Sequence, residues 1–158
     1  MPALNTRFFN FGWLLVWLAP LLTALAARGP VPLDETRYLT VAWEMWSRGS
    51  FAVPFLNGVP YSHKPPLLFW LIHAGWWVTG VSTLWPRMIP GLCALGCLYL
   101  SRRLSRMLWP DDERTAGTVV WVLAGSLAWA VWGQMLLFDL LLAVFVLLTA
   151  SALWKLGQ

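Results

Sequence analysis

Hydrophobic and polar residues are distributed unevenly along this chain. Four apolar runs approach the roughly 20 residues that a bilayer core requires, and they cover residues 11–27, 86–104, 115–132 and 135–154. Charged residues, prolines and glycines concentrate between the first two runs, in residues 28–85. The pattern predicts an all-α integral membrane protein with about four transmembrane helices and one long external loop.

The external loop contains two helical patterns of its own. In residues 34–48 most charged side chains fall on one side of a helix and most apolar ones on the other. This predicts an amphipathic helix in the membrane interface with its apolar face toward lipid. Glu35 projects toward the apolar side and Val41 toward the polar side, against the pattern. A second helix is predicted over residues 66–80, and at about 1.5 Å per residue it is too short to cross the bilayer, so both helices are predicted to be juxtamembrane.

Turn signals mark the boundaries of these two helices. Gly49 follows the first helix at the position where a left-handed glycine often ends a helix. Asn57–Gly58 is a strong turn signal. The Pro65–Pro66 pair suits the opening of the second helix. The polar residues between these signals are therefore predicted to lie in a connection beside the membrane.

Composition supports the membrane class and excludes others. The chain is 59% hydrophobic and 11% charged, and it holds 13 tryptophans in 158 residues, which suits interfacial aromatic belts. The net charge is only +4, and no basic run is interleaved with aromatics, so membrane lipids rather than nucleic acid are the expected partners. Cys93 and Cys97 lie in an apolar run and are expected to pack as small residues rather than to form a disulfide or metal site.

The basic residues predict the orientation. A cluster lies in or beside the connection between the second and third runs: Arg102, Arg103, Arg106 and Arg114. The positive-inside rule places this connection in the cytoplasm, so residues 28–85 are predicted to face the periplasm or exterior. Arg7 and the segment Ala24-Leu25-Ala26 leave open the alternative that the first run is a cleaved signal peptide.

Two acidic residues are the leading catalytic candidates. Asp34 begins the polar segment, and Asp139 lies inside the aliphatic fourth run, where an unpaired carboxylate is costly. The topology predicts that both lie near the outer surface, where partial desolvation raises the pKa of a carboxyl group toward the range of a general base. The structural alternatives are an N-cap role for Asp34 beside Glu35 in the first turn and a solvated pair for Glu44 and Arg48.

Lys64 and Arg37 are the candidates for binding a phosphate group. Cationic donors at the membrane surface stabilise the charge that develops on a departing phosphate. Lys64 also has the simpler interpretation of an ammonium group that reaches lipid headgroups. Glu35, Tyr61 and His63 are further site candidates. A divalent metal cofactor is left open, with His63 as its candidate ligand.

The pattern D-E-x-R-Y at residues 34–38, followed by L-N-G-x-x-Y-x-x-K-P at residues 56–65, carries a family resemblance. It resembles the first external loop of GT-C fold lipid-linked sugar transferases, the protein O-mannosyltransferase and aminoarabinose (lipid A) transferase superfamily. The resemblance covers most of the chain and implies that Asp34 and Asp139 are the catalytic acids and that Lys64 precedes the second juxtamembrane helix. In the aminoarabinose transferases the residue before this lysine is acidic, whereas here it is His63, so sugar, acceptor and metal stay open.

This resemblance implies an inverting membrane glycosyltransferase of the bacterial inner membrane. Such an enzyme moves a sugar from a polyprenyl-phosphate donor to a lipid or protein acceptor on the outer face. Enzymes of this family typically have many more spans, so the chain is expected to be an N-terminal module that is inactive alone. The chain has no Asp-x-Asp motif or glycine-rich phosphate loop, which argues against a nucleotide-sugar donor. Two alternatives are an inert scaffold or lipid-phosphate-binding remnant and, more weakly, a small transporter or channel subunit.

Overall fold

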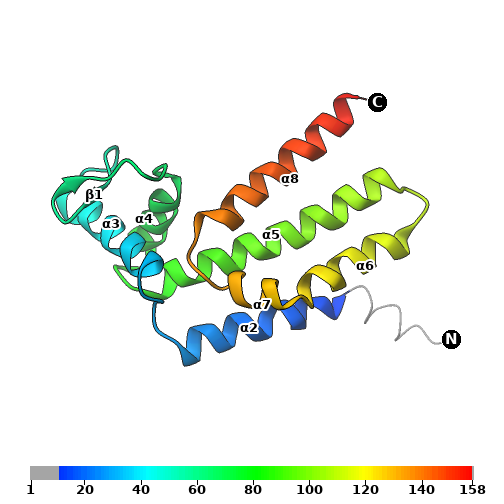
Figure 1. Ribbon diagram of the computed structural model, residues 1–158, viewed down its shortest axis with the longest axis horizontal. Helices are drawn as coiled ribbons and strands as arrows, with labels where there is room; N and C mark the ends of the chain where they lie inside the picture. The colour runs from blue at the N-terminus through cyan, green and yellow to red at the C-terminus, as the bar shows by residue number, and fades with distance from the viewer. Residues whose placement is uncertain (1–10, 158) are drawn as a thin grey trace.

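The computed structural model describes residues 11–157, which are mostly helical (Figure 1). The elements in chain order are α2 (Trp13–Ala27), α3 (Asp34–Arg48), β1 (Phe55–Leu56), β2 (Val59–Pro60), α4 (Leu67–Thr79), α5 (Leu84–Leu108), α6 (Glu113–Ala124), α7 (Leu127–Trp132) and α8 (Phe138–Leu156). Helices α2, α5, α6 and α8 form a bundle, while α3, α4 and the hairpin gather at one end of it. The end formed by residues 28–85 is named the loop end, and the opposite end, where α5 turns into α6, is named the arginine end.

Helix α5 is the central helix of the bundle and contacts α2, α4, α6 and α8. It approaches α2 closely at Gly91, where a Cβ would come within 2.7 Å of the Leu21 side chain. At the same place the indole Nε1 of Trp17 donates a hydrogen bond to the carbonyl of Gly91 at 2.8 Å. Pro20 and Pro90 lie inside α2 and α5, as the sequence indicates. The two helices therefore dock through a small residue and one directional bond.

Most of the apolar face of α3 packs against α4 inside the protein, so the expectation that this face lies toward lipid is wrong for its buried part, while Trp43 of the same face is 50% exposed. Tyr38, Ala42 and Met45 from α3 are buried with side chains of α4 in one hydrophobic cluster. Val41, which projects toward the polar side of an ideal amphipathic helix, is fully buried in this cluster. The ring Nε2 of His73 on α4 lies 2.9 Å from the carbonyl oxygen of Ala42. Helix α4 thus covers most of the surface that the sequence assigns to the bilayer.

The local boundaries at the loop end are confirmed. Helix α3 spans the predicted residues 34–48, and Gly49 ends it with φ +64°, in the left-handed region. Helix α4 begins directly after Pro66. Asn57 and Gly58 have φ values of +54° and +83° and connect the two short strands as a two-residue turn.

The third apolar run differs from its prediction. The structure divides residues 115–132 between α6 and α7, with a break at Gly125 and Ser126. The hydroxyl of Ser126 accepts the backbone N–H of Trp129 at 3.2 Å, so it caps the start of α7. In a continuous helix a backbone carbonyl would accept the Trp129 N–H, so the Ser126 cap marks a break in the helix. Helix α6 therefore ends before it is long enough to span a bilayer.

One helix of the described part, α8, is both long and apolar enough to cross a membrane. Its 19 residues correspond to about 28 Å at the usual helical rise. Helices α2 and α4 are shorter apolar helices, and the longer α5 carries arginines in its C-terminal half. The number of four spans therefore stays a prediction. Arg7, on which the signal-peptide alternative partly rests, lies outside the described residues.

Candidate functional site

The predicted site residues meet at the loop end, where α3 and α8 both begin. The rings of Tyr38 and Phe138 are in edge-to-face contact, with centroids 5.0 Å apart. The ammonium Nζ of Lys64 lies 5.5 Å from the centroid of the same Phe138 ring. Phe138 is followed directly by Asp139. One aromatic ring therefore brings the first turn of α8 against both α3 and the segment before α4.

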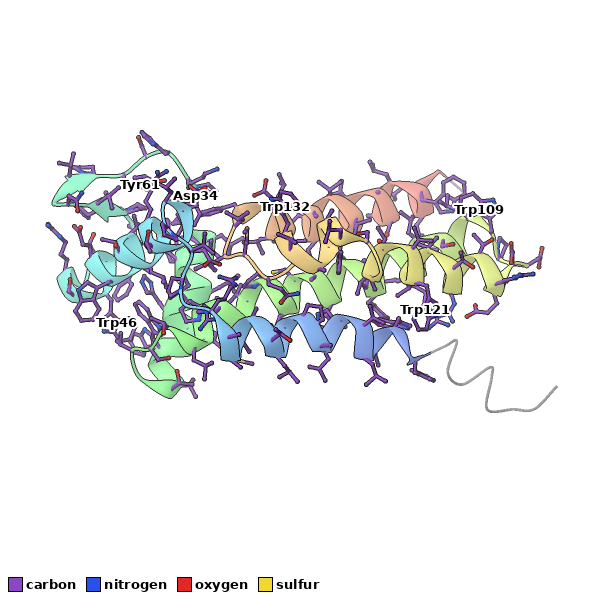
Figure 2. All side chains as sticks on the ribbon, turned by 60° about the horizontal axis from the view of Figure 1, so that its bottom comes forward. Asp34, Trp46, Tyr61, Trp109, Trp121 and Trp132 are labelled. Carbon is purple, nitrogen blue, oxygen red and sulfur yellow. The ribbon has the colours of Figure 1, made fainter. Side chains whose placement is uncertain are left out.

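Asp34 is the first residue of α3, and its side chain is 53% exposed. Its carboxylate lies 3.5 Å from the guanidinium of Arg37, one turn later. The position before α3 is Leu33, and it makes no side-chain capping bond, so the N-cap alternative for Asp34 is wrong. Figure 2 shows Asp34 and Tyr61 at one end of the molecule and Trp109 at the other. Asp34 is thus an accessible carboxylate at the surface of the loop end.

Asp139 lies in the first turn of α8 and is exposed. The expectation that it is buried inside a span is wrong, because the helix begins at Phe138 rather than at Met135. A carboxylate in the first turn is favoured by the partial positive charge of the helix N-terminus. Asp139 therefore needs no buried partner, and its carboxylate is free to face a ligand.

The two aspartates act on one hydroxyl group. Burial raises the pKa of the Tyr38 phenol, and the negative charge of Asp34 raises it further. Tyr61 and the charge of Asp139 add to this increase, while Arg37 opposes it. The contacts agree with this joint influence, because Tyr38 lies one helical turn after Asp34 and its ring touches Phe138, the residue before Asp139. The structure thus brings together the two candidate acids from opposite ends of the chain.

The candidate cations have different surroundings. Lys64 is exposed, and the side chain of Arg37 is 41% exposed. Arg48, by contrast, lies over the ring of Phe55 at 4.7 Å and pairs with Glu44 at 3.6 Å, so the predicted Glu44–Arg48 pair is confirmed. Lys64 and Arg37 can therefore reach a phosphate group at the surface. Arg48 is 45% exposed but is already engaged by Phe55 and Glu44, so it supports the hairpin.

Tyr61 and His63 lie next to each other in the connection before α4. Tyr61 is 7% exposed, and its backbone N–H donates to the carbonyl of Pro54 at 2.8 Å. The rings of Tyr61 and His63 have centroids 5.1 Å apart, and His63 is exposed. Within residues 11–157, no three side chains of His, Cys, Asp or Glu gather as metal ligands. The described residues therefore do not form a binding site for a divalent cation from three or more such side chains.

Glu35 has a structural position that the sequence does not show. Its side chain is 2% exposed, and its carboxylate accepts two hydrogen bonds from the guanidinium of Arg28, at 2.7 and 3.2 Å. It also accepts the backbone N–H groups of Val31 and Leu136. Burial raises the pKa of Glu35, but the bonds from Arg28, Val31 and Leu136 outweigh it and lower the pKa, so the carboxylate stays ionised. Glu35 therefore does not face the open site. The sequence signal for this is the position of Glu35 on the apolar side of the helix predicted over residues 34–48.

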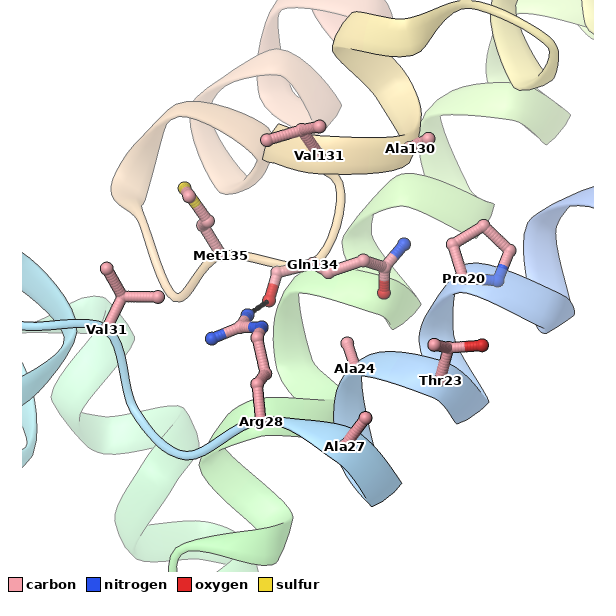
Figure 3. Close-up of a pocket in the computed structure, with 10 residues that line it drawn as sticks. All are labelled: Pro20, Thr23, Ala24, Ala27, Arg28, Val31, Ala130, Val131, Gln134 and Met135. Atoms are coloured by element: carbon pink, nitrogen blue, oxygen red, sulfur yellow. Dashed lines mark hydrogen bonds between the residues drawn. The ribbon is translucent and has the colours of Figure 1, made fainter.

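A pocket of about 390 Å³ lies beside this ion pair, between α2 and α7 (Figure 3). Its walls are mostly apolar, and Thr23, Arg28 and Gln134 supply its polar side chains. The guanidinium of Arg28 donates to the backbone carbonyl of Gln134. The guanidinium of Arg87, on α5, donates to the carbonyls of Ala24 and Arg28 and so satisfies the end of α2. Sequence reasoning missed Arg87, because its partners lie in another helix.

Comparison with known proteins finds similarity to a group of bacterial transferases. An undecaprenyl phosphate-alpha-4-amino-4-deoxy-L-arabinose arabinosyl transferase from Photorhabdus laumondii is 28% identical over 131 residues, which is 81% of this chain and 24% of the relative. A transferase of this kind from Pseudomonas fluorescens is 30% identical over 118 residues, 75% of this chain and 20% of the relative. One from Proteus mirabilis is 27% identical over 140 residues, 87% of this chain and 25% of the relative. No protein-family model and no solved structure matches the chain.

The chain spans a quarter or less of the length of these relatives. The similarity nevertheless includes most of the chain, and it agrees with the resemblance carried by the motifs at residues 34–38 and 56–65. The helical architecture and the apolar helix α8 fit a membrane protein. Sequence similarity and structure together are consistent with a part of a GT-C type, lipid-linked membrane glycosyltransferase.

Proposed function

We propose that this chain carries one side of the active site of a membrane glycosyltransferase. The enzyme would move a sugar from a polyprenyl-phosphate donor to a lipid or protein acceptor at the outer face of the bacterial inner membrane. The observation that carries this proposal is the convergence of two accessible carboxylates and an accessible lysine around Tyr38 and Phe138. The similarity to transferases whose name includes undecaprenyl phosphate supports the donor class.

The cations of the site would hold the phosphate of the donor. Lys64 presents an exposed ammonium group at the edge of the site, beside Phe138. Arg37 pairs with Asp34 at 3.5 Å on the surface, and an exposed pair of this kind is weak. A phosphate can therefore replace Asp34 as the partner of Arg37, which would release the Asp34 carboxylate when the donor binds.

The carboxylates would serve the transfer step. In an inverting transfer, the acceptor oxygen attacks the anomeric carbon from the side opposite the phosphate, and the bond from that carbon to the phosphate oxygen breaks. Asp34 would take the proton of the acceptor hydroxyl as general base, and the electron pair leaves with the phosphate, whose charge Lys64 stabilises. Asp139 would orient the acceptor or offset positive charge on the sugar ring.

The openness of the site bears on activity. Asp34, Lys64 and Asp139 are all exposed in this structure. A transfer site that admits water loses the donor to hydrolysis and weakens its own electrostatics. We therefore propose that the 158-residue chain binds the donor lipid without transferring its sugar. Turnover of a labelled polyprenyl-phosphate sugar by the purified chain would overturn this part of the proposal.

Binding of a polyprenyl phosphate, measured by native mass spectrometry, tests the donor site. The wild type should bind it above the uncharged polyprenol, and Lys64→Ala should abolish that difference, while Asp34→Asn should keep it. Arg48→Ala is the matched control, because Arg48 is a cation of the same loop that is occupied by Phe55 and Glu44. Equal loss in Arg48→Ala and Lys64→Ala, or no preference of the wild type for the phosphate, would contradict the proposal.

A further inference from the structure

We infer that Glu35 is a positioning residue of the proposed site: its buried carboxylate ties the start of α3 to the segment that starts α8 and so fixes how Asp34 and Asp139 stand to each other. The catalytic consequence of this inference rests on the proposed function. The positioning itself concerns the fold and can be measured without a substrate.

The first part of the argument is the bond between Glu35 and Leu136. The Leu136 N–H donates to the Glu35 carboxylate at 2.7 Å, across 101 residues of sequence. Leu136 is fully buried and lies in the connection between α7 and α8, where no helix supplies a carbonyl for its N–H. A buried N–H without a partner is costly. Glu35 therefore holds the backbone of this connection in place.

The second part is the way Arg28 extends this bond into a network. Its guanidinium binds both oxygens of Glu35 and donates to the carbonyl of Gln134, two residues before Leu136 (Figure 3). The backbone carbonyl of Arg28 is itself held by Arg87 of α5. One ion pair thus joins four segments: the end of α2, the start of α3, α5 and the α7–α8 connection.

The third part is the location of this network relative to the candidate acids. Glu35 follows Asp34 directly, and Leu136 precedes Asp139 by three residues. Buried ion pairs contribute little net stability compared with apolar packing, and their best-attested use is to fix register. The Glu35 carboxylate bonds the nearby Val31 N–H and the distant Leu136 N–H, and these directional bonds set such a register, whereas apolar contacts would allow the two segments to slide.

A second glutamate of α3 shows what a different attachment does. Glu44 accepts the backbone N–H groups of Asn57 and Gly58, so it supports the hairpin turn. Like Glu35, it binds two backbone N–H groups and one arginine, but it has no contact with α8 among the bonds of the described residues. Glu44 is therefore a matched control on the same helix.

Spin labels on the two candidate acids test the inference. Asp34→Cys and Asp139→Cys would carry the labels, since both positions are exposed, in a chain whose own cysteines are replaced by Cys93→Ala and Cys97→Ala. EPR dipolar broadening then reports the distribution of label separations. Glu35→Gln should broaden or shift this distribution, because its amide N–H₂ meets other donors, while Glu44→Gln should leave it unchanged. A Glu35→Gln distribution equal to that of the parent would overturn the inference.

Arg28→Lys provides a second test should Glu35→Gln fail to fold. A single ammonium group cannot bind both Glu35 oxygens and the Gln134 carbonyl with the fork geometry of a guanidinium. The separation should therefore shift in the same direction as in Glu35→Gln, and an unchanged distribution would contradict the inference. These readouts need no lipid. An intact separation with no binding of polyprenyl phosphate would instead count against the proposed function alone.

Discussion

Two glutamates at opposite ends of the bundle bind arginines with the same chemistry in different surroundings. At the loop end, Glu35 is 2% exposed and binds Arg28. At the arginine end, the side chain of Glu113 is 56% exposed and accepts hydrogen bonds from Arg102 at 2.9 Å and from Arg106 at 2.7 Å. The difference shows that the number of ion pairs does not indicate which one matters most for stability. Burial and bonds to backbone groups decide how much each pair contributes to the free energy of unfolding.

The pKa of the exposed glutamate illustrates this. The hydrogen bond from Arg106, followed by that from Arg102, lowers the pKa of Glu113 to about 2. Water and salt screen this exposed pair, so the shift corresponds to much less stability than its size indicates. Glu35 is itself buried, while its partner Arg28 is 27% exposed, and Glu35 also bonds two backbone N–H groups, so the loss of its carboxylate leaves the buried Leu136 N–H without a partner.

The largest effect is expected from Glu35→Ala. Removing one partner of a buried ion pair destabilises a protein by about 3 to 5 kcal/mol. Arg28 is 27% exposed and can be partly rehydrated, so we expect the lower part of this range, with the loss of the acceptor of the Leu136 N–H included. Chemical denaturation in detergent micelles would measure the free energy of unfolding. A loss below about 1 kcal/mol, the size expected of an exposed pair, would remove the distinction between the two ends.

Arg87→Met is expected to have the next largest effect. The substitution removes the side-chain donor of the Arg28 carbonyl and one of the two donors of the Ala24 carbonyl, which keeps the backbone N–H of Arg28, and an unsatisfied buried group costs about 1 to 3 kcal/mol. The control is Arg103→Met, because Arg103 is exposed on the same helix. Equal free energies of unfolding for the two variants would show that Arg87 does not support the loop end.

Acid should weaken the loop end through His73. Burial lowers the pKa of His73, and the bond to the Ala42 carbonyl offsets this only in part. The unfolded chain then binds the proton more readily, so stability is complete above the unfolded pKa of about 6.5 and falls as the pH drops below it. Unfolding midpoints at about pH 7.5 and about pH 5.5 should differ less in His73→Gln than in the wild type. The variant His63→Gln, which replaces an exposed ring, should keep the wild-type difference.

Glu113→Gln is expected to have the smallest effect. An exposed pair contributes about 0 to 1 kcal/mol, and added salt should reduce even this difference between variant and wild type. The free energy of unfolding, measured at low and high salt, checks both statements. A loss as large as that of Glu35→Ala would mean that the arginine end, rather than the loop end, holds the fold together.

The local structure of the loop end could be predicted from the sequence, because its signals are local. The amphipathic pattern of α3, the left-handed Gly49 and the Asn57–Gly58 turn all act within a few residues, and each is confirmed. The meeting of the α3 and α8 starts also follows from the predicted topology, and the contact between Tyr38 and Phe138 agrees with it.

What the sequence could not provide depends on distant partners. A helical projection shows that Glu35 faces the apolar side of α3. It does not show that Arg28 and the Leu136 N–H donate hydrogen bonds to Glu35 there. The start of α8 was also unpredictable: Leu137 is extended, with φ −121° and ψ 159°, so the helix begins at Phe138 and leaves Asp139 exposed in its first turn. The break before α7 did have a local signal, the capping side chain of Ser126.

The measurement that tests the central claim most directly is the location of the lipid phosphate on the chain. Charge alone would place it at the arginine end, where Arg102, Arg103, Arg106 and Arg114 gather. Photo-crosslinking with a polyprenyl phosphate that carries a photoreactive group near its phosphate, followed by peptide mapping, distinguishes the two ends. The account predicts labelled peptides that contain Lys64 or Asp139, with the label lost in Lys64→Ala. Labelling confined to residues 102–114, unchanged in Lys64→Ala, would contradict it.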